Sequence, residues 1–180
     1  MSKKVRQLSK KVGQNKLSAK ATVLEFFFDN PQRKITVREL AKQLKINKSK
    51  VQYYLQSLRQ EGLVSSENRW VDTWFNRLIK SNYYTEKICR SGLIDYINEE
   101  LGASAIILFG SFRKGESVKD SDIDIFVECA RDKELNLSHY KQLLGHEIEI
   151  FVKPKITLLP KELLNNVVNG IKLRGFFTVK

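Results

Sequence analysis

The sequence has little cysteine and histidine, and it lacks any long hydrophobic run. Its two cysteines, Cys89 and Cys129, show no C-x-x-C spacing and make no recognisable zinc pattern with His139 and His146, so reduced thiols without a disulfide are expected. No apolar segment approaches the roughly 20 residues that a helix needs to cross a bilayer, and the lysine-rich start lacks the hydrophobic segment of a secretory signal. We therefore expect a soluble, cytoplasmic protein that makes no membrane contact.

Acidic residues are also scarce, but only in the first part of the chain. Residues 1–70 carry 16 Lys and Arg against 5 Asp and Glu, whereas residues 71–180 carry 16 against 15. No acid precedes Glu25, and residues 1–17 are interpreted as a basic flexible arm. This asymmetry indicates two parts with different partners, of which the first suits a polyanion. The length of 180 residues allows one or two domains with ordinary cores.

Residues 18–60 have the periodicity of three helices. An apolar face follows Ser18 and ends before Pro31, where the residue preceding a proline disfavours helix. Thr36 stands three residues before Glu39, which is the spacing of a capping box at the start of a second helix. A third helix is predicted over residues 48–60, ending near Gly62.

Residues 63–70 could add a small wing after the third helix, and residues 18–70 together resemble a winged helix-turn-helix domain. Several side chains of the third helix are not needed for its core, and they combine cations suited to phosphates with groups able to reach base edges. We therefore predict duplex DNA as the partner of Lys48, Ser49, Lys50, Gln52 and Tyr53, with Arg69 added from the wing. The same fold also serves as a dimerisation or protein-docking module, and the sequence leaves that alternative open.

A linker helix is predicted over residues 71–87, with an apolar side that includes Trp74, Phe75 and Leu78. That side could pack on the first domain, on the second, or on a second copy of the chain in a homodimer. Another helix is expected at about residues 87–101, ending at Gly102, and a second domain over residues 88–180.

Short apolar segments at residues 105–109, 123–127 and 147–152 are predicted to be strands, with a loop at Gly110 and Ser111 after the first. Asp122 and Asp124 are separated by one residue, so their side chains should point to the same side of the second strand. Two carboxylates aimed at one place repel each other unless a cation such as Mg²⁺ lies between them. Glu149 on the next strand could supply a third ligand, although Glu147 shares its face.

The order Gly110-Ser111, ten residues, Asp122-x-Asp124 strongly resembles the polymerase β-like nucleotidyltransferase superfamily, and within it the minimal nucleotidyltransferases. The resemblance extends over residues 88–177. It implies that Gly110 and Ser111, with Arg113 and Lys114 nearby, bind the triphosphate of a nucleotide, most simply ATP. It also implies that Asp122, Asp124 and Glu149 bind two Mg²⁺ ions and are catalytic. Relatives more often carry Asp as the third acid, and Arg113-Lys114 stands where many have a single Arg.

The fold class expected from these patterns is α+β, with a mostly α winged helix-turn-helix domain followed by a nucleotidyltransferase domain containing a small mixed sheet. Two functions remain open. One is a magnesium-dependent nucleotidyltransferase that places a nucleoside monophosphate on an acceptor, for example a protein, coupled to a DNA-binding domain. The other is a DNA-binding regulator, or an antitoxin-like protein with a toxin partner, whose transferase domain binds a partner or nucleotide without turnover.

Overall fold

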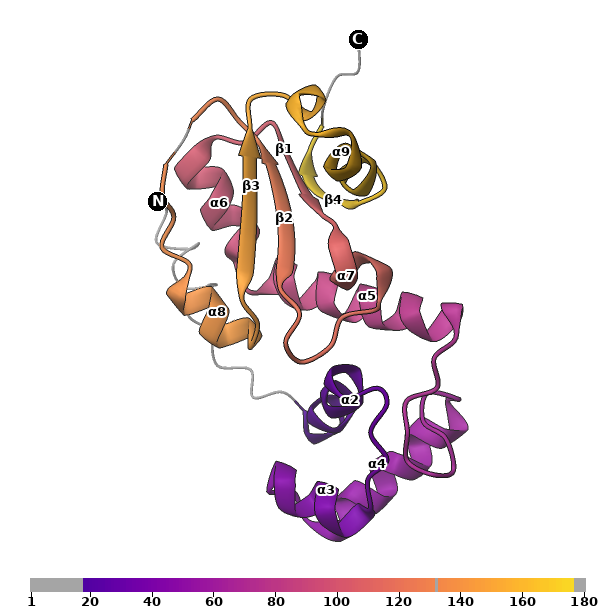
Figure 1. The fold of residues 1–180 in the computed structure, drawn as a ribbon. Coiled ribbons are helices and arrows are strands. Elements are labelled where there is room, and N and C mark those ends of the chain that lie inside the picture. The colour runs from indigo at the N-terminus through magenta and orange to yellow at the C-terminus, as the bar shows by residue number, and fades with distance from the viewer. Residues whose placement is uncertain (1–17, 132, 177–180) are drawn as a thin grey trace.

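The structure is a computed structural model, and it describes residues 18–131 and 133–176. The basic arm expected over residues 1–17 lies outside the described residues. In Figure 1 a small helical domain lies at one end, a sheet with its helices at the other, and the long helix α5 runs between them.

The helical domain contains α2 (Ala19–Asp29), α3 (Val37–Leu44) and α4 (Lys48–Gln60), which confirms the three predicted helices. Each begins at a side-chain cap that occupies one of the backbone N–H groups left free in a first turn. The Ser18 hydroxyl accepts from Ala21 N at 3.2 Å and the Asn47 amide oxygen accepts from Ser49 N at 2.9 Å. Thr36 and Glu39 form the predicted capping box.

The wing is a short antiparallel bridge between Val64 and Trp70. The Trp70 ring packs edge-on against Phe28 with ring centroids 5.0 Å apart, so it joins the wing to the core of the helical domain. That core buries one face of every helix, and its largest fully buried side chains are Phe27, Phe28, Leu40, Leu55 and Leu58.

The linker helix has its predicted length but begins and ends three residues later than predicted. It is α5 (Trp74–Arg90), and the helix expected at residues 87–101 is the separate α6 (Leu93–Leu101). The helix cannot start earlier because Val71 N bonds Leu63 O in the wing, and Thr73 caps the first turn. Gly92, with φ +82°, turns the chain between the two helices.

The apolar side predicted for this helix is not the face that α5 buries within the chain, and its packing on a second copy of the chain stays a prediction. Trp74, Phe75 and Leu78 are exposed, so this apolar side does not bury itself against either part of the chain. The buried side chains are instead Asn76, Lys80, Ser81, Tyr84 and Ile88. Burying polar groups is tolerated because they find partners: the Asn76 amide donates to Gly62 O and Val71 O, at 3.0 and 2.8 Å.

The second domain is built on a four-stranded sheet of order β3-β2-β1-β4, which confirms the expected small mixed sheet. Its strands are β1 (Ala105–Leu108), β2 (Ile123–Glu128), β3 (Ile148–Lys153) and β4 (Ile171–Gly175). β2 and β3 are parallel and the other two pairs are antiparallel. The fourth strand was not predicted. The loop expected at Gly110-Ser111 is instead the short helix α7 (Gly110–Lys114).

Helices lie on both faces of this sheet. Ile106, Leu108, Ile125 and Val127 belong to one continuous core with the buried side chains of α5, α6 and the helical domain. The opposite face carries a smaller core of sheet side chains with the 3₁₀ helix Ile156–Leu158 and α9 (Lys161–Val168). The remaining helix, α8 (Ser138–Leu144), leads into the edge strand β3 (Figure 1). No helix within residues 18–131 and 133–176 is long and apolar enough to cross a membrane.

Candidate active site

The predicted carboxylates lie near the points where β2 and β3 begin. Asp124 is directly opposite Glu149 in the parallel register of the two strands, and Asp122 stands two residues before Asp124. Alternate residues of a strand share a face, so Asp124 lies on the side of Phe126, which belongs to the smaller core beneath α9. The acids therefore occupy one end of that face, beyond the apolar core.

The three acids interact electrostatically, and the effect is strongest on Asp124. Burial first, and then the negative charges of Glu149 and Asp122, raise the pKa of Asp124 to about 6. Asp124 is therefore still mostly ionised at neutral pH, but its charge costs more free energy in the folded chain than that of an ordinary carboxyl group. A cation placed among these oxygens would remove the conflict.

Glu147, the alternative third acid, is engaged elsewhere. It precedes β3, is exposed, and forms an ion pair with Lys141 at 2.5 Å. Its backbone oxygen accepts from Ile123 N at 2.9 Å. Glu149 contributes to the raised pKa of Asp124, whereas Glu147 is not among the causes.

The residues present fit a magnesium site in chemistry, although not as a preformed cage. Within residues 18–131 and 133–176, no group of three or more His, Cys, Asp or Glu side chains is arranged to hold a metal ion. The donors that gather at Asp124 are all carboxylate oxygens, which suit a hard cation such as Mg²⁺ better than zinc.

Gly110 brings the backbone of α7 against Asp124. Its φ of +68° lies in the left-handed region, and a Cβ atom there would stand 1.8 Å from Asp124 Oδ2. Phe109 N also donates to Asp124 O at 3.0 Å. The predicted phosphate-binding turn and the predicted metal-binding strand are thus close together, and a Cβ atom at position 110 would collide with the Asp124 side chain in its present position.

We expect Gly110→Ala to lower the rate of nucleotidyl transfer at least about 10-fold, because Asp124 must move. The free energy of unfolding should fall by about 1 to 3 kcal/mol. Gly92→Ala is the matched control, since Gly92 also has positive φ but an added Cβ would have nothing within 4 Å. It should cost stability, measured by thermal unfolding, without slowing transfer. Equal transfer rates in both variants would contradict the assignment of Gly110.

The other predicted nucleotide-binding residues lie on α7. Ser111 is half-buried, while Arg113 and Lys114 are exposed. Ser81 on α5 donates to Arg113 O at 2.7 Å. A Cβ on Gly115 would stand 2.0 Å from Arg77 O, so the end of α7 lies directly on the backbone of α5. The helix that carries these residues is therefore held firmly in place.

Side chains that the sequence analysis did not single out hold the loop before Asp122. Lys80 on α5 donates to Ser117 O, and His146 Nδ1 lies 3.1 Å from Ser121 O. Burial lowers the pKa of Lys80 to about 8, which leaves the ammonium group protonated near neutral pH. One signal was present in the sequence: Lys80 stands four residues after Asn76 and four before Tyr84, on one face of the helix.

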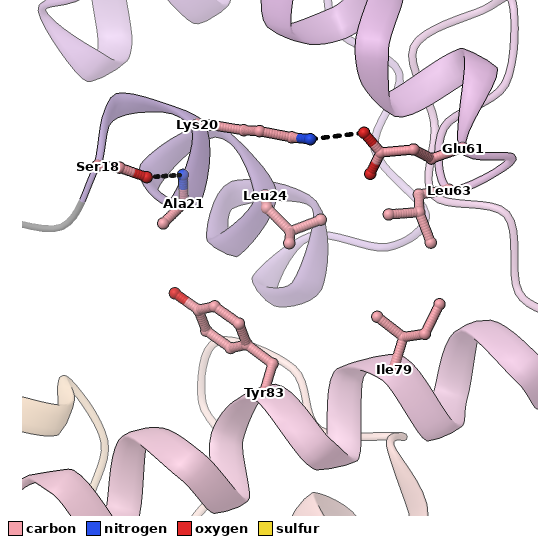
Figure 2. A pocket seen from close by; sticks show the side chains of 8 residues that line it. All are labelled: Ser18, Lys20, Ala21, Leu24, Glu61, Leu63, Ile79 and Tyr83. Carbon is pink, nitrogen blue, oxygen red and sulfur yellow. Dashed lines mark hydrogen bonds and ion pairs between the residues drawn. The ribbon is translucent and has the colours of Figure 1, made fainter.

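Two hollows lie near these elements. A polar one of about 570 Å³ adjoins Asp122 and includes Lys119, Lys141 and His146 in its lining. The other, of about 470 Å³, lies between α2 and α5, with walls formed by Leu24, Leu63, Ile79 and Tyr83. Figure 2 shows the ion pair of Lys20 and Glu61 across it, at 2.5 Å. Its lining includes none of the predicted catalytic residues, so this second hollow does not adjoin the candidate site.

The predicted DNA-contacting side chains of α4 share an exposed surface. Val51, Leu55 and Leu58 face the core, whereas all five predicted residues of this helix are exposed: Lys48, Ser49, Lys50, Gln52 and Tyr53. Arg69 differs from this set, because it is half-buried in the wing, where its backbone N–H donates to the Ser65 hydroxyl at 3.3 Å.

Comparison with known proteins agrees with this division of the chain. Residues 90–173 match the family model described as a nucleotidyltransferase domain, and residues 22–66 match the model for bacterial regulatory proteins of the ArsR family. A protein of Methanocaldococcus jannaschii named "Putative protein adenylyltransferase" is 31% identical over 70 residues, which cover 39% of this chain and 69% of the relative. No solved structure matches the chain significantly.

A sheet domain of this family preceded by a helix-turn-helix defines the class of protein. The chain belongs to the nucleotidyltransferase family, with an ArsR-type helix-turn-helix on its N-terminal side. The predicted enzyme class and the predicted order of the two domain types are confirmed.

Proposed function

We propose that this enzyme transfers a nucleoside monophosphate from a magnesium-bound nucleoside triphosphate, most simply ATP, to a hydroxyl group of an acceptor protein. The observation that carries the proposal is the close approach of the Gly110 backbone to Asp124, a carboxyl group whose pKa is raised in part by the charges of Glu149 and Asp122. ATP and a protein acceptor are supported by the name of the archaeal relative.

Each residue has a separate role in this proposal. Asp122, Asp124 and Glu149 would hold the Mg²⁺ ions, which when bound neutralise phosphate charge and favour ionisation of the attacking hydroxyl. Gly110 lets the triphosphate approach the backbone, and the Ser111 hydroxyl group donates a hydrogen bond to a phosphate oxygen. The exposed cations Arg113 and Lys114 attract the leaving pyrophosphate.

We further propose that the exposed face of α4 binds duplex DNA. The match to an ArsR-type helix-turn-helix supports this role, as does the concentration of positive charge in residues 1–70. Nucleotidyl transfer and DNA binding can be tested separately, because a regulator without turnover would bind DNA but transfer no nucleotide.

The proposed reaction is tested by incubating the full chain with Mg²⁺, cell lysate and ATP labelled either on the α- or on the γ-phosphate. Transfer of AMP marks an acceptor with the α-label alone, because pyrophosphate carries the γ-label away. Marking by the γ-label would instead indicate a kinase. DNA binding in the absence of any labelled acceptor would favour the regulator.

The third carboxylate is tested by a pair of single substitutions. We expect Glu149→Gln to lower transfer at least about 100-fold, because it removes a charged metal ligand. Glu147→Gln should change the rate by no more than about threefold, since this carboxylate lies on the surface beside Lys141. The reverse result, measured by initial rates at saturating Mg²⁺, would assign the third ligand to Glu147.

A further inference from the structure

Lys80 is a fully buried cation at the junction of the two domains. Its side chain is 1% exposed, and its ammonium group donates to Phe28 O at the end of α2, at 2.7 Å, and to Ser117 O. The ammonium also lies 5.6 Å from the centre of the Phe28 ring. Burying a charge is costly unless hydrogen bonds compensate. One of these two hydrogen bonds goes to the helix-turn-helix domain, and the other goes to the loop that leads to Asp122.

Two more contacts hold the same loop. Lys119 N donates to the backbone oxygen of Asp29, the last residue of α2, at 3.0 Å. His146, which is 8% exposed, has Nδ1 at 3.1 Å from Ser121 O, so the proton on Nδ1 is donated to that oxygen. Residues 117, 119 and 121 are therefore each fixed by a hydrogen bond from outside the loop.

His146 is itself fixed by the same junction. Its ring packs edge-on against Phe112 of α7, with centroids 4.9 Å apart, and against Tyr84 of α5. Asp29 accepts a hydrogen bond from the Tyr84 hydroxyl at 3.0 Å and lies 3.8 Å from His146 Nε2. The end of α2, the middle of α5 and the loop thus form one connected cluster.

This loop matters because it determines the position of Asp122. Asp124 is inside β2 and is placed by the sheet, whereas Asp122 precedes the strand and depends on what holds residues 117–121. A displacement of about 1 Å in a catalytic group can cost about 100-fold in rate. The distance between the two carboxylates is therefore sensitive to the junction.

We propose that Lys80 and His146 are positioning residues of the transferase site, and that the end of α2 makes the helix-turn-helix domain a structural part of that site. The part of this inference that concerns catalysis rests on the proposed function. The contacts that define it also predict a change in loop mobility that is measurable without any reaction.

The chain provides a matched control for Lys80. Lys87 lies two turns further along α5 and also joins this helix to α2, through an ion pair with Glu25 at 2.5 Å. Its partners are Glu25, the backbone oxygen of Leu144 and the Tyr84 ring, and none of them is in the loop of residues 117–121. Lys80→Met and Lys87→Met therefore both remove a buried or half-buried link between α2 and α5, and only the first releases the loop.

The first experiment compares these two variants of the full chain. In Lys80→Met we expect hydrogen exchange of residues 117–121 to become at least about 10-fold faster. Single-turnover transfer at saturating Mg-ATP should slow at least about 10-fold, with ATP affinity changed less than about threefold. Lys87→Met should leave both hydrogen exchange in the loop and the transfer rate near their wild-type values, even if its melting temperature falls as much as that of Lys80→Met.

The second experiment does not depend on the folding of Lys80→Met. His146→Leu keeps an apolar side chain but removes the donor to Ser121 O, and should show the same loss of rate at constant ATP affinity. His146→Asn keeps an N–H donor at the corresponding position and should recover a large part of that rate. Unchanged loop exchange in folded Lys80→Met, or equal rates in His146→Leu and wild type, would overturn the proposal. A wild-type protein that transfers nothing would refute the proposed function instead, while the exchange comparison would still measure the contacts of the loop.

Discussion

Replacing both Asp122 and Asp124 by asparagine should reduce nucleotidyl transfer at least about 1,000-fold while the protein remains folded and becomes more stable. The loss follows because two of the three proposed metal ligands lose their charge. Mg²⁺-dependent binding of ATP, measured by calorimetry, should be lost together with the transfer of α-label. Asp120→Asn is the matched control, since Asp120 is an exposed acid in the preceding loop and should affect the rate by less than about threefold. Transfer at the wild-type rate by the double variant would refute the assignment of the site.

The gain in stability has a defined pH dependence. The pKa of Asp124 is raised from 3.8 to about 6 in the folded chain, so ionised Asp124 opposes folding above that pH. Asparagine at this position should raise the free energy of unfolding by about 1 to 2 kcal/mol at pH 7. This is less than the whole rise in the pKa of Asp124 implies, because the carboxyl group is partly exposed. The gain in stability should shrink as the pH falls through 6 and vanish below 3.8, where Asp124 is protonated in both states. Thermal unfolding in the absence of Mg²⁺ measures this difference.

The substitutions Lys48→Ala and Lys50→Ala together should lower the affinity of the full chain for duplex DNA about 10- to 100-fold near 0.1 M salt. They should also reduce the magnitude of the slope of log affinity against log salt concentration by about 1.8. The reason is that each lysine that neutralises a phosphate contributes about 0.9 to this slope. The loss should be similar for all DNA sequences, because phosphate contacts carry no sequence information. Fluorescence anisotropy over a salt series gives both quantities.

Two comparisons make this result specific to α4. Lys153→Ala with Lys155→Ala removes the same charge from exposed positions at the far end of β3, which Figure 1 places away from the helix-turn-helix domain. That variant should keep the wild-type slope. Gln52→Ala or Tyr53→Ala should change the preference among sequences in a binding selection, since these side chains are proposed to reach base edges. A similar small effect of all these changes would show that α4 is not a DNA-binding surface.

The local features of this fold were predictable because each depends on residues close together in the chain. The caps at Ser18 and Thr36 are hydrogen bonds over three residues, and the helices that follow them were predicted within a residue or two. The alternation around Asp122 and Asp124 is likewise a local property of a strand. The same reasoning left open where the apolar side of α5 packs and did not single out Lys80, whereas in the structure Trp74 is exposed and Lys80 is buried.

The sequence by itself thus determined the two domain types, their order, most of the helices and strands, and the motif that joins Gly110-Ser111 to Asp122 and Asp124. Only the tertiary structure decided which third carboxylate lies opposite Asp124, that residues 171–175 form a strand against β1, and that Lys80 is buried. The reason is that periodicity reports whether a side chain is apolar and how often it recurs. The partner of a buried polar atom, such as Phe28 O or Ser117 O for Lys80, is supplied by segments 52 and 37 residues away, and their meeting is fixed by packing.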